Sequence, residues 1–150
     1  MPISGHGDKW LGSFIPYLLY RTSNQLNHRI RSRLRESGVN LARWRVLAVL
    51  RAYGKLSLGQ IVDLTVMQQP SISRVVSQLE REGLAKRQIS KKDSRVVNVR
   101  LTAAGERAFQ EIYPTAQRHQ QQALRGFTKK DINTLTKFLQ RIQENIEAED

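Results

Sequence analysis

The 150-residue sequence contains no cysteine. A disulfide framework, a thiol redox centre and a cysteine-based zinc site are therefore excluded. The sequence also lacks any run of about 18 apolar residues, the length that a helix needs to cross a bilayer. Residues 1–10 lack the basic-then-apolar order of a secretory signal. We therefore expect a cytosolic protein that does not insert into a membrane.

Acidic residues are scarce: the chain has 13 Asp and Glu but 25 Lys and Arg, and its formal net charge is +12. The excess is uneven along the chain. Residues 1–60 hold ten basic and two acidic side chains, residues 61–101 hold eight and four, and residues 102–150 hold seven of each. This charge favours a polyanionic partner, with nucleic acid ahead of an anionic membrane surface. The C-terminal third lies outside that electrostatic footprint.

Residues with catalytic or metal-binding potential are also few. The three histidines, His6, His28 and His119, are scattered and lack the spacing of metal ligands. No glycine-rich phosphate loop follows a predicted strand, and no two carboxylates pair in apolar surroundings. We therefore expect no metal, no cofactor and no catalytic residue, hence a protein that is not an enzyme. Each histidine is expected to have a structural role.

What the sequence does contain is apolar residues at helical spacing, which predict a mainly α fold. The first helix is expected from Trp10 to Glu36, with Gly38 ending it. Pro16 either kinks this helix or marks its start. A second helix is expected over residues 40–54. A short third one, from about Ser57, is expected to bury Leu58, Ile61, Val62 and Leu64.

The next helix, over residues 69–83, has two contrasting sides. Its apolar side carries Ile72, Val75, Val76 and Leu79. Its polar side carries Gln69, Ser71, Ser73, Arg74 and Ser77. With the short helix before it, this segment fits a helix-turn-helix, whose second helix enters the DNA major groove. Small hydroxyl side chains allow close approach and hydrogen-bond bases or phosphates. The alternative is an ordinary amphipathic helix.

A change to period 2 follows, over residues 84–102, and predicts a β-hairpin after the recognition helix, as in a wing. Its tip reads Lys91, Lys92, Asp93, Ser94 and Arg95. Arg95 is suited to the minor groove, where negative potential concentrates. We expect Asp93 to orient Arg95 through a charge-assisted hydrogen bond rather than to touch DNA. The alternative is a solvated turn.

Two further helices are expected after residue 102. The first is capped by Thr102, begins at about Ala103 and is bent by Pro114. Thr128 and Asp131 form a capping-box-like start for the last one. Its apolar residues, Ile132, Leu135, Leu139, Ile142 and Ile146, follow a heptad spacing. We interpret 1–36 and 103–150 as a helical dimerisation region and 37–102 as a winged helix-turn-helix domain. Packing of the last helix against the first within one chain is the alternative.

From about Trp10 to Ala148 the chain resembles the MarR family of winged helix-turn-helix regulators. "LARWRVLAVL" is similar to the second helix of the family, and "LSLGQIVDLT" with "QQPSISRVVSQLEREGLAKR" to its helix-turn-helix. "KKDSRVVNVRLTAAGE" is similar to its wing, with the D-x-R signature at Asp93 and Arg95. Two residues depart from the pattern. Pro70 stands where Ser or Lys is more common, and Lys91 where an acidic residue is common.

The resemblance implies a homodimer that binds a pseudo-palindromic operator in double-stranded DNA as a repressor. A small, aromatic or anionic effector would release it. The expected DNA contacts are Gln68, Gln69, Pro70, Ser71, Ser73, Arg74, Ser77 and the five tip residues. Expected ligand contacts are Tyr17, Tyr20, Arg21, Asn24, Trp44, Arg45, Phe109 and Tyr113, each of which has a plain core role as the alternative. Leu11 and Phe14 join the heptad residues at the expected dimer interface.

A protein that binds nucleic acid or the nucleoid without sequence preference would use the same wing and the same charge. A basic membrane-surface protein explains the sequence less well, because its charges lie on helices that also need a core. Competition between an operator and random DNA at one salt concentration distinguishes a regulator from the non-specific binder.

Overall fold

The computed structural model describes residues 9–149, and the chain divides into two compact units between Ala116 and Gln117. The fold is mainly helical with one small antiparallel sheet, as predicted. The elements are a 3-10 helix η1 (Lys9–Ser13), α1 (Ile15–Glu36), α2 (Leu41–Tyr53), β1 (Leu56–Ser57), α3 (Leu58–Thr65), α4 (Gln69–Arg81), β2 (Ala85–Ile89), β3 (Val97–Leu101), α5 (Ala103–Ala123) and α6 (Lys129–Glu147). Within residues 9–149 no helix is long and apolar enough to span a bilayer.

The first long helix begins later than predicted. The short helix η1 precedes it, Phe14 is extended, and α1 starts at Ile15 rather than at Trp10. Pro16 lies in the first turn of α1, where its missing N–H leaves no hydrogen bond unmade. Pro16 therefore marks the start of the helix and does not kink it. At the other end Gly38 has a φ of 70°, the left-handed conformation predicted for the helix stop.

The short helix α3 buries a different set of residues from the one predicted. Ser57 and Gln60 form a capping box at its start. Ile61 is fully buried, but Leu64 is 40% exposed, so its predicted burial was wrong. Thr65 takes the inner position, because it follows Ile61 by four residues on one face of the helix. Its hydroxyl donates a hydrogen bond of 2.6 Å to the Ile61 carbonyl.

The turn between α3 and α4 contains Val66, the only non-glycine residue with positive φ (53°) in the part of the chain that the structure describes. Helix α4 then begins at Gln69 with Pro70 in its first turn. The predicted apolar side of α4 is buried: Ile72, Val75, Val76 and Leu79. These side chains join one core with residues of α1, α2, α3, α5 and the sheet.

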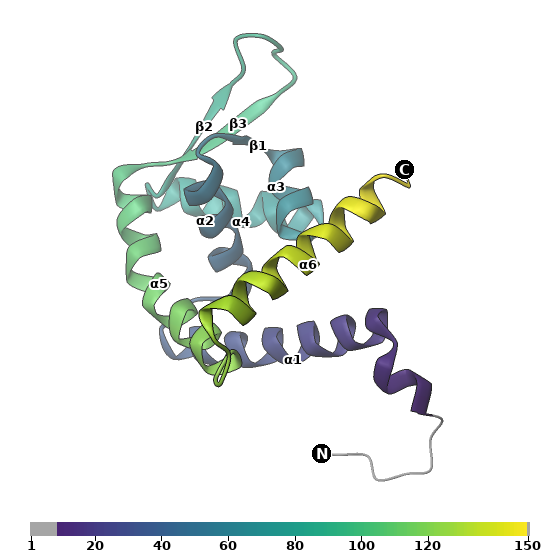
Figure 1. The fold of residues 1–150 in the computed structure, drawn as a ribbon. Helices are drawn as coiled ribbons and strands as arrows, with labels where there is room; N and C mark the ends of the chain where they lie inside the picture. The colour runs from purple at the N-terminus through teal and green to yellow at the C-terminus, as the bar shows by residue number, and fades with distance from the viewer. Residues whose placement is uncertain (1–8, 150) are drawn as a thin grey trace. The chain divides into compact units, whose positions relative to one another are not determined.

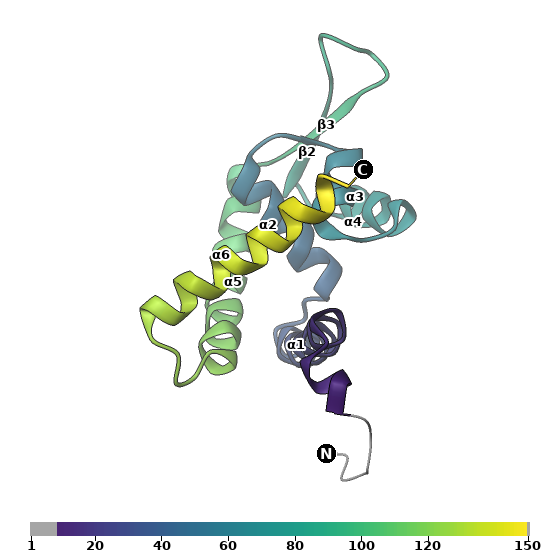
Figure 2. The ribbon, with the colours of Figure 1, turned by 45° about the vertical axis from the view of Figure 1, so that its right-hand side comes forward.

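The sheet has three strands in the order β1-β3-β2, one more than predicted. Strand β1 has only two residues, too few for an alternating pattern to show. In the hairpin, Ala85 faces Leu101 and Ile89 faces Val97. Figures 1 and 2 show this hairpin extending beyond α2, α3 and α4 in both views. The hairpin is thus held at its base by the core and projects its tip into solvent.

The two last helices start at side-chain caps, as predicted. The backbone N–H of Gly105 donates to the Thr102 hydroxyl, which itself donates to the Gly83 carbonyl over 2.6 Å. Thr128 and Asp131 form a reciprocal capping box at the start of α6. Hydrogen bonds from the Thr128 backbone N–H and side chain hold the pKa of Asp131 below its ordinary value. Helix α5 runs through Pro114 without interruption.

Candidate nucleic-acid interface

The solvent side of α4 is polar at its N-terminal end. Gln68, Gln69, Pro70 and Arg74 are exposed, whereas Ser71, Ser73 and Ser77 are half-buried. The first turn contains no acidic residue, and Gln68 makes no side-chain cap. Arg74 has no carboxylate partner among residues 9–149. The N–H groups of this turn and the guanidinium of Arg74 are therefore free to meet an anion or a base edge.

Arg87 on β2 links the hairpin to α4, a contact that the sequence reasoning missed. Its Nη2 donates to the Ser77 hydroxyl over 2.8 Å, and its Nε lies 3.2 Å from Glu80 Oε2. Strand alternation could have indicated the contact. Arg87 lies two residues after the buried Ala85, and so on the side of β2 that faces the helices. Ser77 is therefore held in place by the wing strand.

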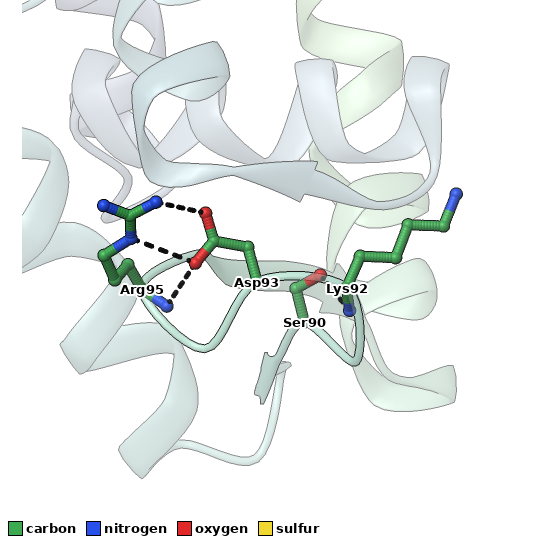
Figure 3. A network of polar contacts seen from close by, with 4 residues as sticks. All are labelled: Ser90, Lys92, Asp93 and Arg95. Carbon is green, nitrogen blue, oxygen red and sulfur yellow. Dashed lines mark hydrogen bonds and ion pairs between the residues drawn. The ribbon is translucent and has the colours of Figure 1, made fainter.

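The tip of the hairpin is organised around Asp93. The backbone N–H of Arg95 donates to Asp93 Oδ1 over 3.0 Å, and its Nε and Nη2 donate to the two carboxylate oxygens, each over 3.2 Å (Figure 3). The Arg95 side chain and then its backbone hold the pKa of Asp93 below its ordinary value. The predicted contact between Asp93 and Arg95 is thus present. It is bidentate, the geometry that fixes a guanidinium most firmly.

The tip presents its cations outward. The Arg95 side chain is 89% exposed even with its carboxylate partner. Lys91, Lys92 and Ser94 are exposed as well. The loop is closed by a hydrogen bond from the Ser90 N–H to the Val96 carbonyl over 2.8 Å. A basic and internally ordered ribbon of this kind suits the negative potential of a DNA minor groove.

A hollow of about 470 Å³ lies among α1, α2 and the end of α3. Its lining comprises Ser23, Asn27, Trp44, Arg45, Ala48, Val49, Leu64, Thr65 and Val66. Nη2 of Arg45 donates to Asn27 Oδ1 over 2.9 Å, and no carboxylate among residues 9–149 pairs with Arg45. Partial burial, and then the charge of Arg31, lower the pKa of Arg45. An anion beside Arg45 would offset both effects, because an opposite charge favours the charged guanidinium.

Of the eight predicted ligand residues, the structure brings Trp44 and Arg45 to this hollow. Asn24 lines a separate one with Arg29 and Arg31. Tyr17 accepts a hydrogen bond from Arg21 on the surface of α1, and Tyr20 is exposed.

Phe109 and Tyr113 of α5 form a column of stacked rings with Trp44. The ring centroids are 5.5 Å apart between Trp44 and Phe109, and 5.3 Å apart between Phe109 and Tyr113. The guanidinium of Arg51 lies 5.9 Å from the Phe109 centroid. These rings therefore pack mainly on one another, and Trp44 connects the column to the hollow.

Apolar side chains are exposed on α6 and also around the start of α1. On α6, Leu135, Leu139 and Ile146 are exposed, Ile132 and Ile142 are half-buried, and none is buried. Around the start of α1, Phe14 is exposed and Leu11 is half-buried. Contiguous apolar surface on a helix is typical of a protein interface. Within residues 9–149 no group of His, Cys, Asp and Glu could hold a metal ion.

Comparison with known proteins adds a family model and a close structural match. The model, described as MarR family, matches residues 37–96, which run from the end of α1 to the hairpin tip. The crystal structure of a MarR family transcriptional regulator from Silicibacter pomeroyi is 32% identical in sequence. It covers 97% of each chain with a TM-score of 0.83.

Two more distant proteins match most of the chain, one by sequence and one by structure. The HTH-type transcriptional repressor IacR of Pseudomonas putida is 24% identical over 132 residues, 88% of this chain and 79% of IacR. The structure of Bordetella bronchiseptica BpsR is 24% identical and covers 86% of this chain and 98% of its own, with a TM-score of 0.72. The similarity therefore extends well beyond the helix-turn-helix.

Proposed function

This chain belongs to the MarR family of transcriptional regulators, and from that we propose that it is a repressor that binds a pseudo-palindromic operator as a homodimer. A small aromatic anion would release it. One observation carries the proposal: the polar side of α4 and the arginine-tipped wing are joined by Arg87 into one basic unit. Such a unit suits two adjacent grooves of one duplex.

Within this unit α4 and the wing have different tasks. Arg74, together with Gln68 and Gln69, is exposed at the N-terminal half of α4, the part of a recognition helix that meets base edges. Arg95, held by Asp93, enters the minor groove as a pre-ordered cation. The hydroxyl of Ser77 is already engaged by Arg87, so Ser77 positions the helix rather than selecting a base.

The dimer is supported by the apolar residues left uncovered on α6 and near the start of α1. Phe14, Leu135, Leu139 and Ile146 are large, apolar and exposed. Covering them with a second copy removes apolar surface from water, which is the usual driving force of an obligate homodimer. A two-fold dimer would place two recognition helices about 34–36 Å apart and require a palindromic site.

The effector is proposed to bind the hollow at Arg45. It would place its ring on Trp44 and its carboxylate beside the guanidinium of Arg45. The Bordetella bronchiseptica relative BpsR has its DNA binding regulated by 6-hydroxynicotinic acid, an aromatic acid. The wall of the hollow includes Leu64 and Val66, at the turn that leads into α4. A ligand that favours a different position of this turn would lower the population of dimers that match the operator.

The test of operator binding starts from a duplex selected from a random pool by the purified protein. We expect the selected sequence to be palindromic and to bind at least a thousandfold more tightly than random DNA at the same salt. Arg74→Ala should weaken binding by about 1–3 kcal/mol and relax preference at one base position. Equal affinity for selected and random duplexes would favour the non-specific nucleoid-binding function instead.

The effector is tested by a thermal-shift screen of aromatic acids. An acid that raises the melting temperature of the wild-type protein should have no effect on Arg45→Met. The matched control is Arg107→Met, which removes an exposed cation from α5. If both variants respond like the wild type, the anion does not bind beside Arg45.

A further inference from the structure

The sheet has a second basic face that the contacts at α4 and the tip do not use. Alternation along the strands turns Leu56, Ala85 and Val99 into the core. The neighbouring positions point the other way. We call Lys86, Gln88, Asn98 and Arg100, together with Lys55 directly before β1, the outer sheet face. All five are polar, and three are cations.

Charges on the outer sheet face repel one another. Lys86 and Arg100 are direct cross-strand partners in the β2–β3 ladder, and like charges in that position destabilise a sheet. None of Lys55, Lys86 and Arg100 has an ion-pair or hydrogen-bond partner among the side chains of residues 9–149. An anion between the strands would remove this repulsion.

A hollow of about 490 Å³ continues this face toward the tip of the wing. Three lysines line it, Lys55, Lys91 and Lys92, and the amides of Gln88 and Asn98 lie between them, with Ile89 and Ser90 completing the wall. None of the lining residues is acidic. Asp93, the acid nearest along the chain, is turned toward Arg95, and Lys92 extends away from that pair (Figure 3). The donors present are those that bind phosphate oxygens.

We propose that the outer sheet face and this hollow bind the sugar-phosphate backbone of DNA that flanks the operator. The inference rests on the proposed operator binding by α4 and the wing. Arg87 ties the inner side of β2 to α4, so the outer sheet face looks away from the recognition helix. A wing inside a minor groove has a backbone on each side of it. The backbone farther from α4 therefore lies against Lys55, Lys86 and Arg100.

The experiment compares two duplexes that contain the selected operator. The short duplex ends at the minor grooves that the wings enter, and the long one extends by about 10 base pairs, roughly one helical turn, at each end. Affinity for both is measured by fluorescence anisotropy between 50 and 200 mM salt. The variant is the triple substitution Lys55→Ala, Lys86→Ala and Arg100→Ala. Its control is Lys129→Ala, Lys130→Ala and Lys137→Ala on α6, which removes the same charge.

The wild type and the control should bind the long duplex more tightly than the short one. The triple variant should bind both alike, and its log–log salt slope on the long duplex should be smaller by about 2.7 per protomer, about 0.9 for each lost phosphate contact. A wild type that gains nothing from the flanks overturns the proposal. So does a triple variant that keeps the full gain.

A scrambled operator of each length separates this result from the proposed function. If the triple variant still prefers the operator to the scrambled duplex, sequence-specific binding is intact. The difference in affinity between the long and short duplexes then tests whether the outer sheet face binds flanking DNA. If the triple variant unfolds at a lower temperature than the wild type, Lys55→Ala alone is used. Its expected slope change is about 0.9 per protomer, and an unchanged slope overturns the proposal.

Discussion

Gly105 joins the wing to α5 at a point where no side chain fits. It is buried in the first turn of α5, and its N–H donates to the Thr102 hydroxyl. A Cβ at this position would overlap the carbonyl oxygen of Leu84, and would lie 3.0 Å from its carbonyl carbon and 3.1 Å from Leu101 Cδ2. We therefore predict that Gly105→Ala destabilises the protein.

The loss of stability in Gly105→Ala depends on which atoms must move to make room for the new Cβ. The obstacle is the Leu84 backbone, whose carbonyl accepts a hydrogen bond from the Thr102 N–H over 3.0 Å. Overpacking costs about 1–3 kcal/mol, and loss of this hydrogen bond costs about 1 kcal/mol more. Alanine recovers up to about 1 kcal/mol of helix propensity. The net loss should be about 2 kcal/mol, a drop of about 4–8 °C in the melting temperature for a chain of this length.

The assay is thermal and urea unfolding followed by circular dichroism, with Gly59→Ala in α3 as the control. A Cβ at position 59 meets only Ser57 Oγ, at 3.9 Å, so this variant should melt at or above the wild-type temperature. If Gly105→Ala melts at the same temperature as the control, the close approach of α5 to Leu84 does not require glycine at position 105.

Three further perturbations test other parts of the chain. Arg95→Ala should weaken operator binding and reduce the log–log salt slope by about 0.9 per protomer, whereas unchanged affinity in a gel-shift titration would remove the wing tip from the interface. The Arg43–Glu82 ion pair lowers the pKa of Glu82, so its contribution to stability is present above the ordinary pKa of glutamate and is lost as pH falls through the lowered value. In urea unfolding, Glu82→Gln should be less stable than the wild type at pH 7 and equal to it in acid; a gap that persists in acid would assign the effect to packing. Val66, at φ 53° and 88% exposed, should be replaceable by Asn with a gain of about 0.5–1 kcal/mol, because Asn tolerates the left-handed region; a lower melting temperature would contradict this.

The features predicted correctly depend on residues close together in the chain. The caps at Thr102 and Thr128 and the stop at Gly38 are local hydrogen-bond or backbone effects. The Asp93–Arg95 contact spans two residues. Such features can be inferred from spacing alone, because only a few conformations of a short segment satisfy them.

The features missed depend on residues far apart. Strand β1 exists because Leu56 and Ser57 lie beside Val99 and Asn98, and two residues carry no period of their own. The link from Arg87 to Ser77 requires the wing strand to pack beside α4. Leu64 is apolar and was predicted to be buried, but the packing of α3 at Ile61 turns Thr65 inward instead, one helical turn later.

The sequence by itself therefore determined which segments are helices, where the wing lies and which face of α4 is polar, since local periodicity and capping decide these. Only the tertiary structure decided which distant side chains meet. It paired Arg87 with Ser77, stacked Trp44 on Phe109 and gathered Lys55 beside Lys91 and Lys92. The physical reason is that burial of the shared core favours one arrangement of the elements. This packing is cooperative and depends on several segments together, so the sequence of one segment does not predict it.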